Sequence, residues 1–364
     1  MAKLELQNIS MKYQQQVILN EFNLTIKNGE LLVLLGDSGC GKTTLIKIIA
    51  GIIAPESGKI LMDDQTMGKI PSQYRKVGYV PQSQVLFPHL TIRENVIFGL
   101  KAQKLAKDEI QQKLEHVANL TAIKGIINRY PSEISGGQKQ RVALARAMAV
   151  EPQILLLDEP LSSIDATNRE SLAMMIRKIQ QNTHTTVLYV THNQEEARLI
   201  SDQVAIIADG QILQQGRMLD IERTPYNFTV AKIIGLPNLW AITSCTDSKD
   251  KVHIITTLGE FTVLKPSEPY QRFSAIQIPP NVITCHTDPP QPTSPLDPDT
   301  VQKKGKIFAI QLQDHGHLRI ILEFPHPHFQ NYLKIEAKIQ KESQIPQIDQ
   351  DIWITFAMKD ILIF

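Results

Sequence analysis

The sequence has few cysteines and no long apolar run. Its 364 residues include three cysteines, Cys40, Cys245 and Cys285, which form no CxxC pair. This odd, dispersed set excludes a disulfide framework and a cysteine zinc site, and it favours a reducing cytosol. No segment approaches the ~20 apolar residues of a membrane-spanning helix. The start, Met-Ala-Lys-Leu-Glu-Leu, lacks a signal-peptide pattern. We therefore expect an intracellular chain that does not itself cross a membrane.

An excess of charge of one sign is also missing. Lys and Arg number 38 against 37 Asp and Glu, so no global field draws the chain to nucleic acid or to anionic lipid. We expect no nucleic-acid partner. The length suits two domains on the usual scale of about 100–200 residues each.

A glycine-rich segment follows the apolar run Leu31–Leu35 and fits the phosphate-loop pattern G-x-x-x-x-G-K-[ST]. Such a loop points successive N–H groups at an anion, and the helix expected from Lys42 adds the positive end of its dipole. Lys42 would supply a full charge to the outer phosphates, and Thr43 would place its hydroxyl on Mg²⁺. A chance glycine-rich turn is the alternative, and the strand before and helix after argue against it. The segment reads Gly36, Asp37, Ser38, Gly39, Cys40, Gly41, Lys42, Thr43 and Thr44.

A second apolar run, Ile154–Leu157, ends in Asp158 and Glu159. Such a run is typical of a central parallel strand buried on both faces, and ligands bind at the carboxyl ends of such strands in open α/β sheets. We expect Asp158 to hold Mg²⁺ through its water shell and Glu159 to polarise the attacking water as a general base. A solvated Asp-Glu pair at a strand end is the alternative, which the nearby phosphate loop disfavours.

Together these motifs resemble an ATP-binding-cassette (ABC) ATPase, specifically the detached ATPase subunit of a bacterial solute importer, over Leu4 to about Gly235. The segment Ile134-Ser135-Gly136-Gly137-Gln138 is similar to the family signature Leu-Ser-Gly-Gly-Gln. It precedes an Ala-rich helix expected over Val142–Ala149 and so provides a second anion-binding helix start. The resemblance implies that Ser135 of one copy closes on the γ-phosphate held by Lys42 of the other, in a two-fold symmetric head-to-tail dimer.

Further site residues follow from the resemblance one at a time. Tyr13 looks like the ring on which adenine stacks, with a half-buried strand tyrosine as the alternative. Gln82 matches the Q-loop glutamine, which touches Mg²⁺ and the attacking water. The segment Ser162–Asp165 resembles the D-loop, whose Asp165 communicates across the dimer. His192 follows an apolar strand and resembles the switch histidine that hydrogen-bonds the γ-phosphate.

The expected fold class is α/β: a P-loop NTPase core with a mostly parallel sheet, an antiparallel β subdomain and a helical subdomain, followed by a small all-β, oligonucleotide-fold-like domain. The ABC ATPase domain covers residues 1–235. Its helical subdomain, at about 91–150, opens with a capping box, Thr91-Ile-Arg-Glu94. A hairpin, Val204–Gln215, turns at Asp209-Gly210.

Residues 236–364 are predicted to form an all-β regulatory domain with a proline-rich loop at Pro289–Pro298. The domain resembles those appended to importer ATPases for molybdate, tungstate, sulfate, iron, polyamines and sugars. Its expected strands include Val301–Ile310, Leu318–Phe324 and Ile352–Ile363. Four histidines match no closed zinc site in their spacing and are interpreted as solvated loop residues. They are His315, His317, His326 and His328.

The predicted function is that of an ATP-hydrolysing subunit that powers solute import through a separate membrane permease, as a dimer with composite nucleotide sites. ATP and Mg²⁺ are the expected cofactors. The expected partners are a second ABC subunit, identical or paired, a membrane permease subunit and, indirectly, a periplasmic or lipid-anchored solute-binding protein. The resemblance places the chain in the cytoplasm, peripheral on the inner face of the cell membrane.

Several points stay open at this level. A soluble ABC ATPase not linked to transport is the alternative, although tandem cassettes, coiled-coil insertions and Cys-rich zinc modules are missing from the sequence. A pure binding regulator is disfavoured because Lys42 and Glu159 are both present. We expect Leu86, Phe87 and Leu90 to be exposed as a permease contact. An oxyanion is the first guess for the solute, with ferric iron and polyamine close behind.

Overall fold

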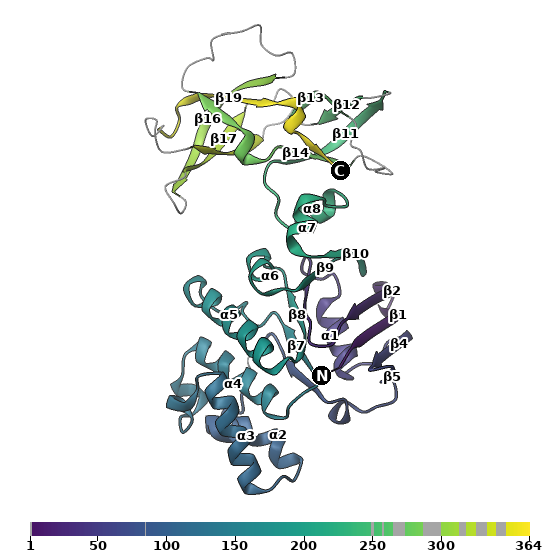
Figure 1. Cartoon of the computed structure of the whole chain (residues 1–364), viewed down its shortest axis with the longest axis vertical. Helices are drawn as coiled ribbons and strands as arrows, with labels where there is room; N and C mark the ends of the chain where they lie inside the picture. Colours follow the sequence, from purple (N-terminus) through teal and green to yellow (C-terminus); the bar gives the residue numbers. More distant parts are fainter. Residues whose placement is uncertain are drawn as a thin grey trace. The chain divides into compact units, whose positions relative to one another are not determined.

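The computed structural model describes residues 2–83, 85–248, 251–256, 258–264, 274–286, 300–312, 318–324, 333–339 and 347–364. The chain divides into two compact units, Met1–Arg223 and Thr224–Phe364 (Figure 1). Helix α8 (Phe228–Ile233) thus falls in the second unit, whereas the sequence placed the domain boundary after Gly235. The expected proline-rich loop and the histidines at 315, 317, 326 and 328 lie outside the described residues.

A six-stranded sheet with the order β10-β9-β3-β8-β7-β6 is the centre of the first unit (Figure 1). Strand β10 is an antiparallel edge and the other five are parallel. The three inner strands β3, β8 and β7 are buried along their whole length, as their apolar runs predict. The bounds are β3 (Leu31–Leu35), β6 (Val77–Val80), β7 (Ile154–Asp158), β8 (Thr186–Thr191), β9 (Gln203–Ala208) and β10 (Gln211–Gly216).

Alternate residues of the central strands face opposite layers. Leu34, Leu156 and Val190 share one core cluster with helix α1 (Lys42–Ala50) and with a second, antiparallel sheet of order β2-β1-β4-β5. Helix α6 contacts β3 and β8. The other bounds are β1 (Leu4–Tyr13), β2 (Gln16–Ile26), β4 (Ser57–Met62), β5 (Gln65–Thr66), α5 (Ala166–Thr183), α6 (Gln194–Ile200) and α7 (Met218–Arg223).

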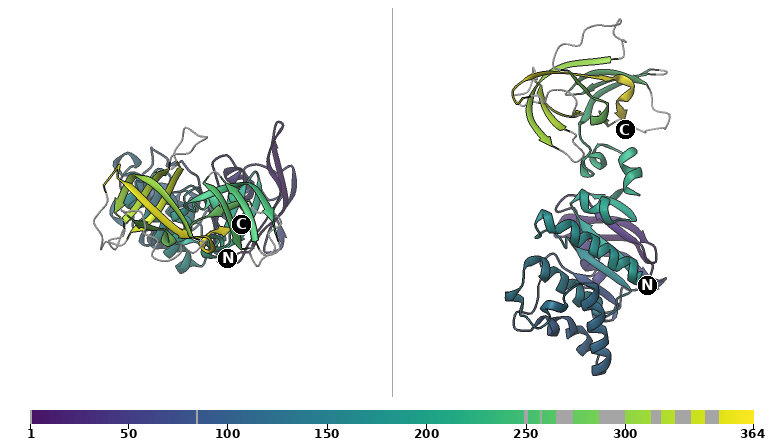
Figure 2. Two further views of the ribbon diagram at one scale, coloured as in Figure 1. Left: turned by 90° about the horizontal axis from the view of Figure 1, so that it is seen from above. Right: turned by 60° about the vertical axis from the view of Figure 1, so that its left-hand side comes forward.

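Helices α2 (Ile92–Ala102), α3 (Lys107–Leu120) and α4 (Gly136–Ala149) pack on one another as the helical subdomain (Figure 2). The predicted capping box is confirmed: the Thr91 N–H donates to Glu94 Oε2 at 2.8 Å, and the Glu94 N–H donates to Thr91 Oγ1 at 3.3 Å. The predicted hairpin is confirmed as well. Its turn residues Asp209 and Gly210 have φ of 48° and 72°, as a two-residue type I′ turn requires.

After helix α8, the second unit contains two antiparallel five-stranded sheets, so the predicted all-β architecture is confirmed from Leu239 onward. The strand orders are β13-β12-β11-β14-β20 and β15-β19-β16-β17-β18. Trp240 and Val252 of the first sheet share one core cluster with Ile320 and Ile354 of the second. The bounds are β11 (Leu239–Asp247), β12 (Lys251–Thr256), β13 (Gly259–Leu264), β14 (Ala275–Gln277), β15 (Thr284–His286), β16 (Thr300–Leu312), β17 (Leu318–Phe324), β18 (Leu333–Ile339), β19 (Asp351–Ala357) and β20 (Leu362–Ile363).

The prediction of a strand over Ile352–Ile363 was wrong in one respect, because the segment is not continuous. A 3₁₀ turn, Met358–Asp360, interrupts it. Strand β19 therefore pairs with β15 and β16, whereas β20 crosses to the other sheet and pairs Ile363 with Ile276 of β14. Among the described residues, the other 3₁₀ helices are Ser72–Tyr74, Lys124–Ile126, Pro131–Glu133 and Pro280–Val282.

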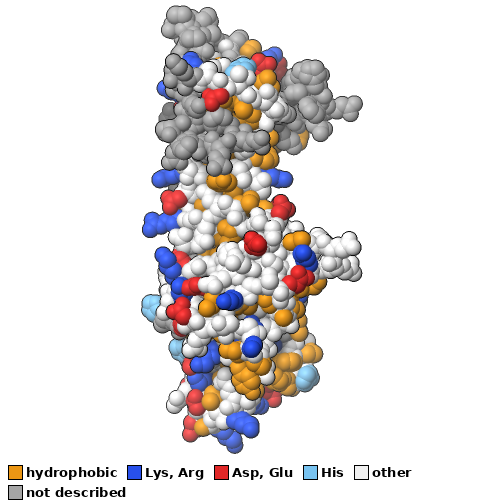
Figure 3. All heavy atoms as spheres, turned by 90° about the vertical axis from the view of Figure 1, so that its right-hand side faces the viewer, with side chains coloured by type: hydrophobic (Ala, Val, Ile, Leu, Met, Phe, Trp, Pro, Cys, Tyr) orange, Lys and Arg blue, Asp and Glu red, His pale blue; other side chains and the backbone are white. Residues whose placement is uncertain are grey.

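The surface reflects the balanced charge of the sequence. On the face drawn in Figure 3, acidic and basic side chains are interspersed, and the formal net charge is +1. Within the part of the chain that the structure describes, no helix combines the length and the apolar character needed to cross a bilayer.

Candidate nucleotide site

The phosphate loop connects β3 to α1 and depends on its glycines. Gly39 and Gly41 have φ of 86° and 101°, a region that other residues adopt only with strain. A Cβ at Gly36 would lie 2.3 Å from the Ile207 carbonyl oxygen, because the loop runs against strand β9. Gly41 is the N-cap of α1 and offers no side-chain cap. The first N–H groups of α1 therefore have no cap side chain competing for them, as an anion site requires.

Lys42 is buried inside the curl of this loop. Its Nζ donates to the carbonyl oxygens of Gly36 at 2.8 Å and Asp37 at 2.7 Å, and lies 3.7 Å from Cys40 Sγ. Burial raises the pKa of the Cys40 thiol, which keeps that sulfur neutral. The hydrogen-bond partners of the ammonium group are thus neutral, and a phosphate group would compensate its charge.

Asp158 ends β7 directly beside the helix start. Thr43 Oγ1 donates to Asp158 Oδ1 at 3.0 Å, and the Tyr79 hydroxyl lies 3.5 Å from Oδ2. Burial raises the pKa of the Asp158 carboxyl group, opposed by the Thr43 hydrogen bond. Burial also raises the pKa of Tyr79 to about 12, so Tyr79 stays a neutral donor. The paired oxygens of the buried Asp158 carboxylate and the exposed Thr43 hydroxyl match the ligand chemistry of Mg²⁺.

The three predicted catalytic residues meet at one carboxylate oxygen. Glu159 Oε2 accepts a hydrogen bond from Gln82 Nε2 at 3.0 Å and lies 3.3 Å from His192 Nδ1. These side chains follow the carboxyl ends of the neighbouring strands β6, β7 and β8, which the sheet order brings side by side.

The backbone at Glu159 adopts a conformation that the sequence does not reveal. Its φ of 43° is uncommon for a residue other than glycine. The Glu159 N–H donates to the Val190 carbonyl at 2.9 Å, and its own carbonyl accepts from the Ser162 N–H at 3.2 Å and Oγ at 3.0 Å. Strained backbone of this kind persists only where the surroundings enforce it, so these bonds aim the Glu159 side chain.

Tyr13 lies at the end of β1 and is 48% exposed. It pairs with Gln16 across the hairpin, two residues before Ile18, whose carbonyl a Cβ on Gly41 would approach to 2.9 Å. Strand β2, with which Tyr13 pairs, therefore passes beside the phosphate loop at Ile18. Its stacking role stays a prediction.

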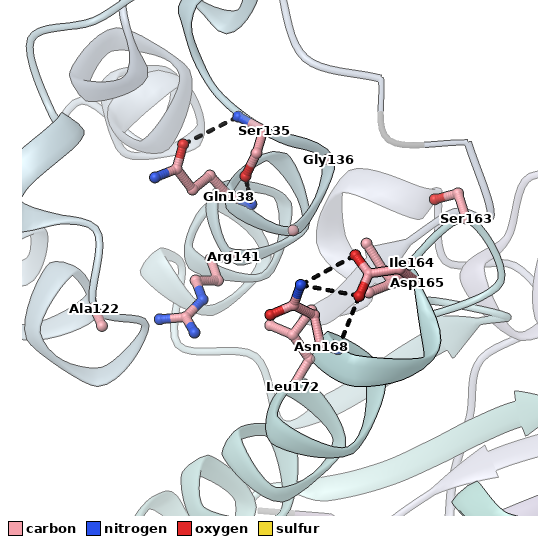
Figure 4. A pocket seen from close by; sticks show the side chains of 11 residues that line it. Ala122, Ser135, Gly136, Gln138, Arg141, Ser163, Ile164, Asp165, Asn168 and Leu172 are labelled. Carbon is pink, nitrogen blue, oxygen red and sulfur yellow. Dashed lines mark hydrogen bonds between the residues drawn. The ribbon is translucent and has the colours of Figure 1, made fainter.

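The signature segment lines a separate pocket of about 540 Å³, shown in Figure 4. Ser135 is the N-cap of α4: the Gln138 N–H donates to Ser135 Oγ at 3.3 Å, and the Ser135 N–H donates to Gln138 Oε1 at 3.0 Å. The glycines 136 and 137 are thus in the first turn of a helix that begins earlier than the expected Val142.

Asp165 faces the signature helix across this pocket (Figure 4). It is the N-cap of α5, where Oδ1 accepts from the Asn168 N–H at 3.0 Å. The pocket also has Arg141 in its wall, a residue that the sequence did not single out. The structure therefore brings the signature and the D-loop together, and the pocket wall includes no residue of the phosphate loop at 36–44.

The segment after Gln82 corrects one expectation. Leu86 is only 7% exposed and belongs to the interior, whereas Phe87 and Leu90 are half-buried. The Asn95 side chain fixes this turn, because Oδ1 accepts from the Phe87 N–H at 2.8 Å and Nδ2 donates to the Phe87 and Leu90 carbonyls at 3.1 Å each. Sequence pattern alone did not show this contact to the next helix.

The exposed apolar side chains of this region are instead Val85, at 59%, and Phe98, at 49%. The Phe98 ring lies 4.6 Å from the Phe87 ring, centroid to centroid, and the Arg146 guanidinium lies 5.5 Å from the Phe87 centroid. The Phe87 ring thus packs against the Phe98 ring. We call the two exposed residues Val85 and Phe98 the apolar edge.

Comparison with known proteins decides the family. A family profile described as ABC transporter matches residues 19–162. The spermidine/putrescine import ATP-binding protein PotA of Haemophilus influenzae is 33% identical over 325 residues, which cover 88% of this chain and 87% of that protein. This chain belongs to the ABC transporter family of ATP-binding subunits. A second relative, the Fe(3+) ions import ATP-binding protein FbpC of Photobacterium profundum, is 43% identical over 235 residues, 65% of this chain and 67% of that protein.

Solved structures agree on the fold of this ABC ATPase. A dimeric ATP-binding cassette in a post-hydrolysis state, bound to ADP and Pi, matches with a TM-score of 0.54 and 28% identity over 59% of this chain and 98% of that chain. CbiO1 from Clostridium perfringens, part of an ABC transporter complex, matches with a TM-score of 0.55 and 27% identity over 61% and 95%. The sequence-based predictions of fold class, family and ATPase activity are confirmed.

Proposed function

We propose that this ABC ATPase hydrolyses ATP at the inner face of the cell membrane to drive a solute through a separate permease subunit. One observation carries this proposal: Gln82 and His192 both approach the same carboxylate oxygen of Glu159, the residue after Asp158, which contacts Thr43 of the phosphate loop. The alternative is an ABC ATPase that is not linked to transport.

The proposed chemistry assigns one task to each side chain. Lys42 and the first N–H groups of α1 hold the outer phosphates, and the Tyr13 ring stacks on adenine. Glu159 accepts a proton from the attacking water as a general base. Gln82 and His192, both at hydrogen-bonding distance from Glu159, orient that carboxylate, and His192 is also available to the γ-phosphate. Thr43 and Asp158, with Gln82, would hold Mg²⁺, which neutralises phosphate charge during the transfer.

The nucleotide site is proposed to be shared by two copies of the chain. The signature pocket has a capped helix start, and its wall lacks the phosphate loop. A second copy that docks head to tail would bring Lys42 and its nucleotide to Ser135, in an isologous arrangement. Asp165 in the same wall would then face the partner. The dimeric cassette that resembles this chain supports the arrangement.

The partner at the membrane is proposed to contact the apolar edge, because exposed Val85 and Phe98 follow the Gln82 segment that reaches the catalytic carboxylate. A solute-binding protein outside the membrane would act through the permease. The all-β part of the second unit, residues 236–364, is proposed as the regulatory domain.

A cationic solute is proposed. The two relatives described above are named for spermidine/putrescine and for Fe(3+) import. These names favour a polyamine or ferric iron over the oxyanion that the sequence placed first.

Uptake of labelled solute tests this proposal. Cells that lack their own copy of this chain are supplied with the wild type or with Glu159→Gln and given labelled spermidine or ferric iron. We expect the wild type alone to restore uptake of one of them. Normal ATP hydrolysis by the wild type without restored uptake of any tested solute would favour the transport-independent alternative.

A further inference from the structure

The buried carboxylate of Glu196 is hydrogen-bonded to the strand that leads into His192. Glu196 of α6 is only 5% exposed. Its Oε2 accepts hydrogen bonds from the Tyr189 hydroxyl and from Thr191 Oγ1, at 2.8 Å each. Burying a carboxylate is costly unless it is well hydrogen-bonded, and both donors come from β8, the strand that ends at His192. The carboxylate is therefore tied to this strand end.

The same network holds the backbone on both sides of His192. Thr191 Oγ1, which donates to Glu196, also accepts from the Asn193 N–H at 3.0 Å. Asn193 Oδ1 in turn accepts from the N–H groups of Glu195 at 2.8 Å and Glu196 at 3.2 Å, and so caps α6. Because the residues before and after His192 are both fixed to α6, the position of Glu196 determines where the imidazole is presented.

Arg169 connects this network to the D-loop. Its Nη2 donates to the carbonyl of Ile164, in the D-loop, at 3.0 Å. Its Nε lies 3.8 Å from Glu196 Oε1, beyond hydrogen-bonding distance, and this buried nitrogen has no hydrogen-bond partner among the described residues. A hollow of about 290 Å³ beside the pair has Arg169, Asn193 and Glu196 in its wall. A small shift of α5 or α6 could therefore complete the bond.

We infer that Glu196 is a positioning residue for His192, and that Arg169 couples it to the D-loop. When a second copy engages the D-loop, the Arg169 Nε–H bonds Glu196 Oε1, and the backbone around His192 is fixed in its working position. This inference rests on the role proposed above for His192. Proton transfer stays with Glu159, and neither Glu196 nor Arg169 touches the substrate.

A double-mutant cycle with His192→Ala tests the inference on the full chain. Arg169→Gln and Glu196→Gln should each lower kcat for ATP hydrolysis by about 10–100-fold, the scale expected when a catalytic group is misplaced, while KM for ATP stays within about 3-fold. In the His192→Ala background neither substitution should lower kcat further. A residue with a merely structural role would keep its full effect there.

The matched control is Arg177→Gln. Arg177 lies on the same helix α5 and pairs with Asp202 through contacts of 2.5 and 3.0 Å, but Asp202 precedes β9 and bonds to the Leu31 N–H rather than to the switch segment. The Arg177→Gln substitution should lower the melting temperature and leave kcat within about 2-fold of the wild-type value.

Two results would overturn the inference: unchanged kcat in Arg169→Gln and Glu196→Gln, or losses that persist in the His192→Ala background. If Glu196→Gln does not fold, Arg169→Gln carries the same test, because that side chain is 31% exposed. Unchanged kcat in His192→Ala alone would remove the proposed role of His192, and this inference with it, while leaving the ATPase assignment intact.

Discussion

The phosphate loop and the signature segment both lead into the N-terminus of a helix, but the two N-termini differ in their capping and in their surroundings. At the phosphate loop, Gly41 offers no cap and a buried Lys42 ammonium fills the curl. At the signature, Ser135 and Gln138 cap α4 reciprocally and face an open pocket of about 540 Å³. The phosphate loop has a buried charge and the hydrogen-bonded cluster of Gln82, Glu159 and His192 near it, whereas the signature segment lines an open pocket. The difference indicates that one chain contains the reactive half and the closing half of a site, at separate places.

The largest effect is expected at the reactive half. Glu159→Gln should lower ATP turnover by about 10²–10⁴, the usual contribution of a general base, because an amide cannot accept the proton from water. ATP binding should persist, and size-exclusion chromatography with ATP should show more dimer. Glu109→Gln, at an exposed carboxylate of α3, is the control and should keep turnover within about 2-fold. Near-normal activity of Glu159→Gln would remove Glu159 from the mechanism.

The closing half should show the next largest effect. Ser135→Arg places a long side chain in the signature pocket and removes a proposed phosphate donor. We expect ATPase activity to fall by about 10²–10³, the range for loss of one transition-state hydrogen bond. ATP affinity measured at low protein concentration should change little, since the phosphate loop is intact. A loss of affinity as large as the loss of turnover would mean that Ser135 acts within its own subunit.

Sequence reasoning succeeded where a motif coincided with a local pattern. Buried apolar runs predicted β3, β7 and β8, and the motifs at their ends located Lys42 and Glu159. The early start of α4 was missed because a Gly-Gly pair weakens helix propensity, although Ser135-x-x-Gln138 has the form of a capping box. The φ of Glu159 depends on hydrogen bonds to Val190 and Ser162, and the turn after Leu86 depends on hydrogen bonds from Asn95 to Phe87 and Leu90, all of which form only in the folded chain.

The two capping boxes of the helical subdomain provide an internal comparison. Thr91→Ala and Ser135→Ala each remove an N-cap hydroxyl, and each should lower the free energy of unfolding by about 1 kcal/mol. Only Ser135→Ala should also lower ATPase turnover. Denaturant unfolding and steady-state kinetics measure both quantities. Equal kinetic effects of the two substitutions would show that the Ser135 cap serves the fold alone.

Low pH should weaken the Thr91–Glu94 capping box, and the loss of stability should be smaller than that caused by Thr91→Ala. The Thr91 N–H holds the pKa of Glu94 below its ordinary value of 4.5. A carboxylate whose pKa is lower in the folded than in the unfolded state stabilises the folded state above pH 4.5. This stabilisation is lost as the pH falls through the folded-state pKa. Melting temperatures of the wild type and Glu94→Gln should therefore converge as the pH drops below 4.5. A constant difference down to acid unfolding would contradict the capping contribution of the carboxylate.

The apolar edge should affect assembly but not chemistry. Phe98→Asp leaves the carboxylate cluster untouched, so ATPase activity of the isolated chain should stay within a few-fold, while an unpaired charge at a buried interface weakens binding to the permease by several kcal/mol. Leu219→Asp, at an exposed apolar residue of α7, is the matched control. Pull-down with tagged permease measures the difference. Full recovery of the complex with Phe98→Asp would exclude this edge as the docking surface.

Mixing two inactive variants tests most directly whether each site is shared by two chains. Ser135→Arg retains the phosphate loop, and Lys42→Ala retains the signature, so a mixed dimer has one site built from intact halves. Each variant alone should have at most about 1% of wild-type ATPase activity. With random pairing of equal amounts, we expect about a quarter of wild-type activity, because half of the dimers carry one of two sites. A mixture that stays as inactive as its components would contradict the shared site.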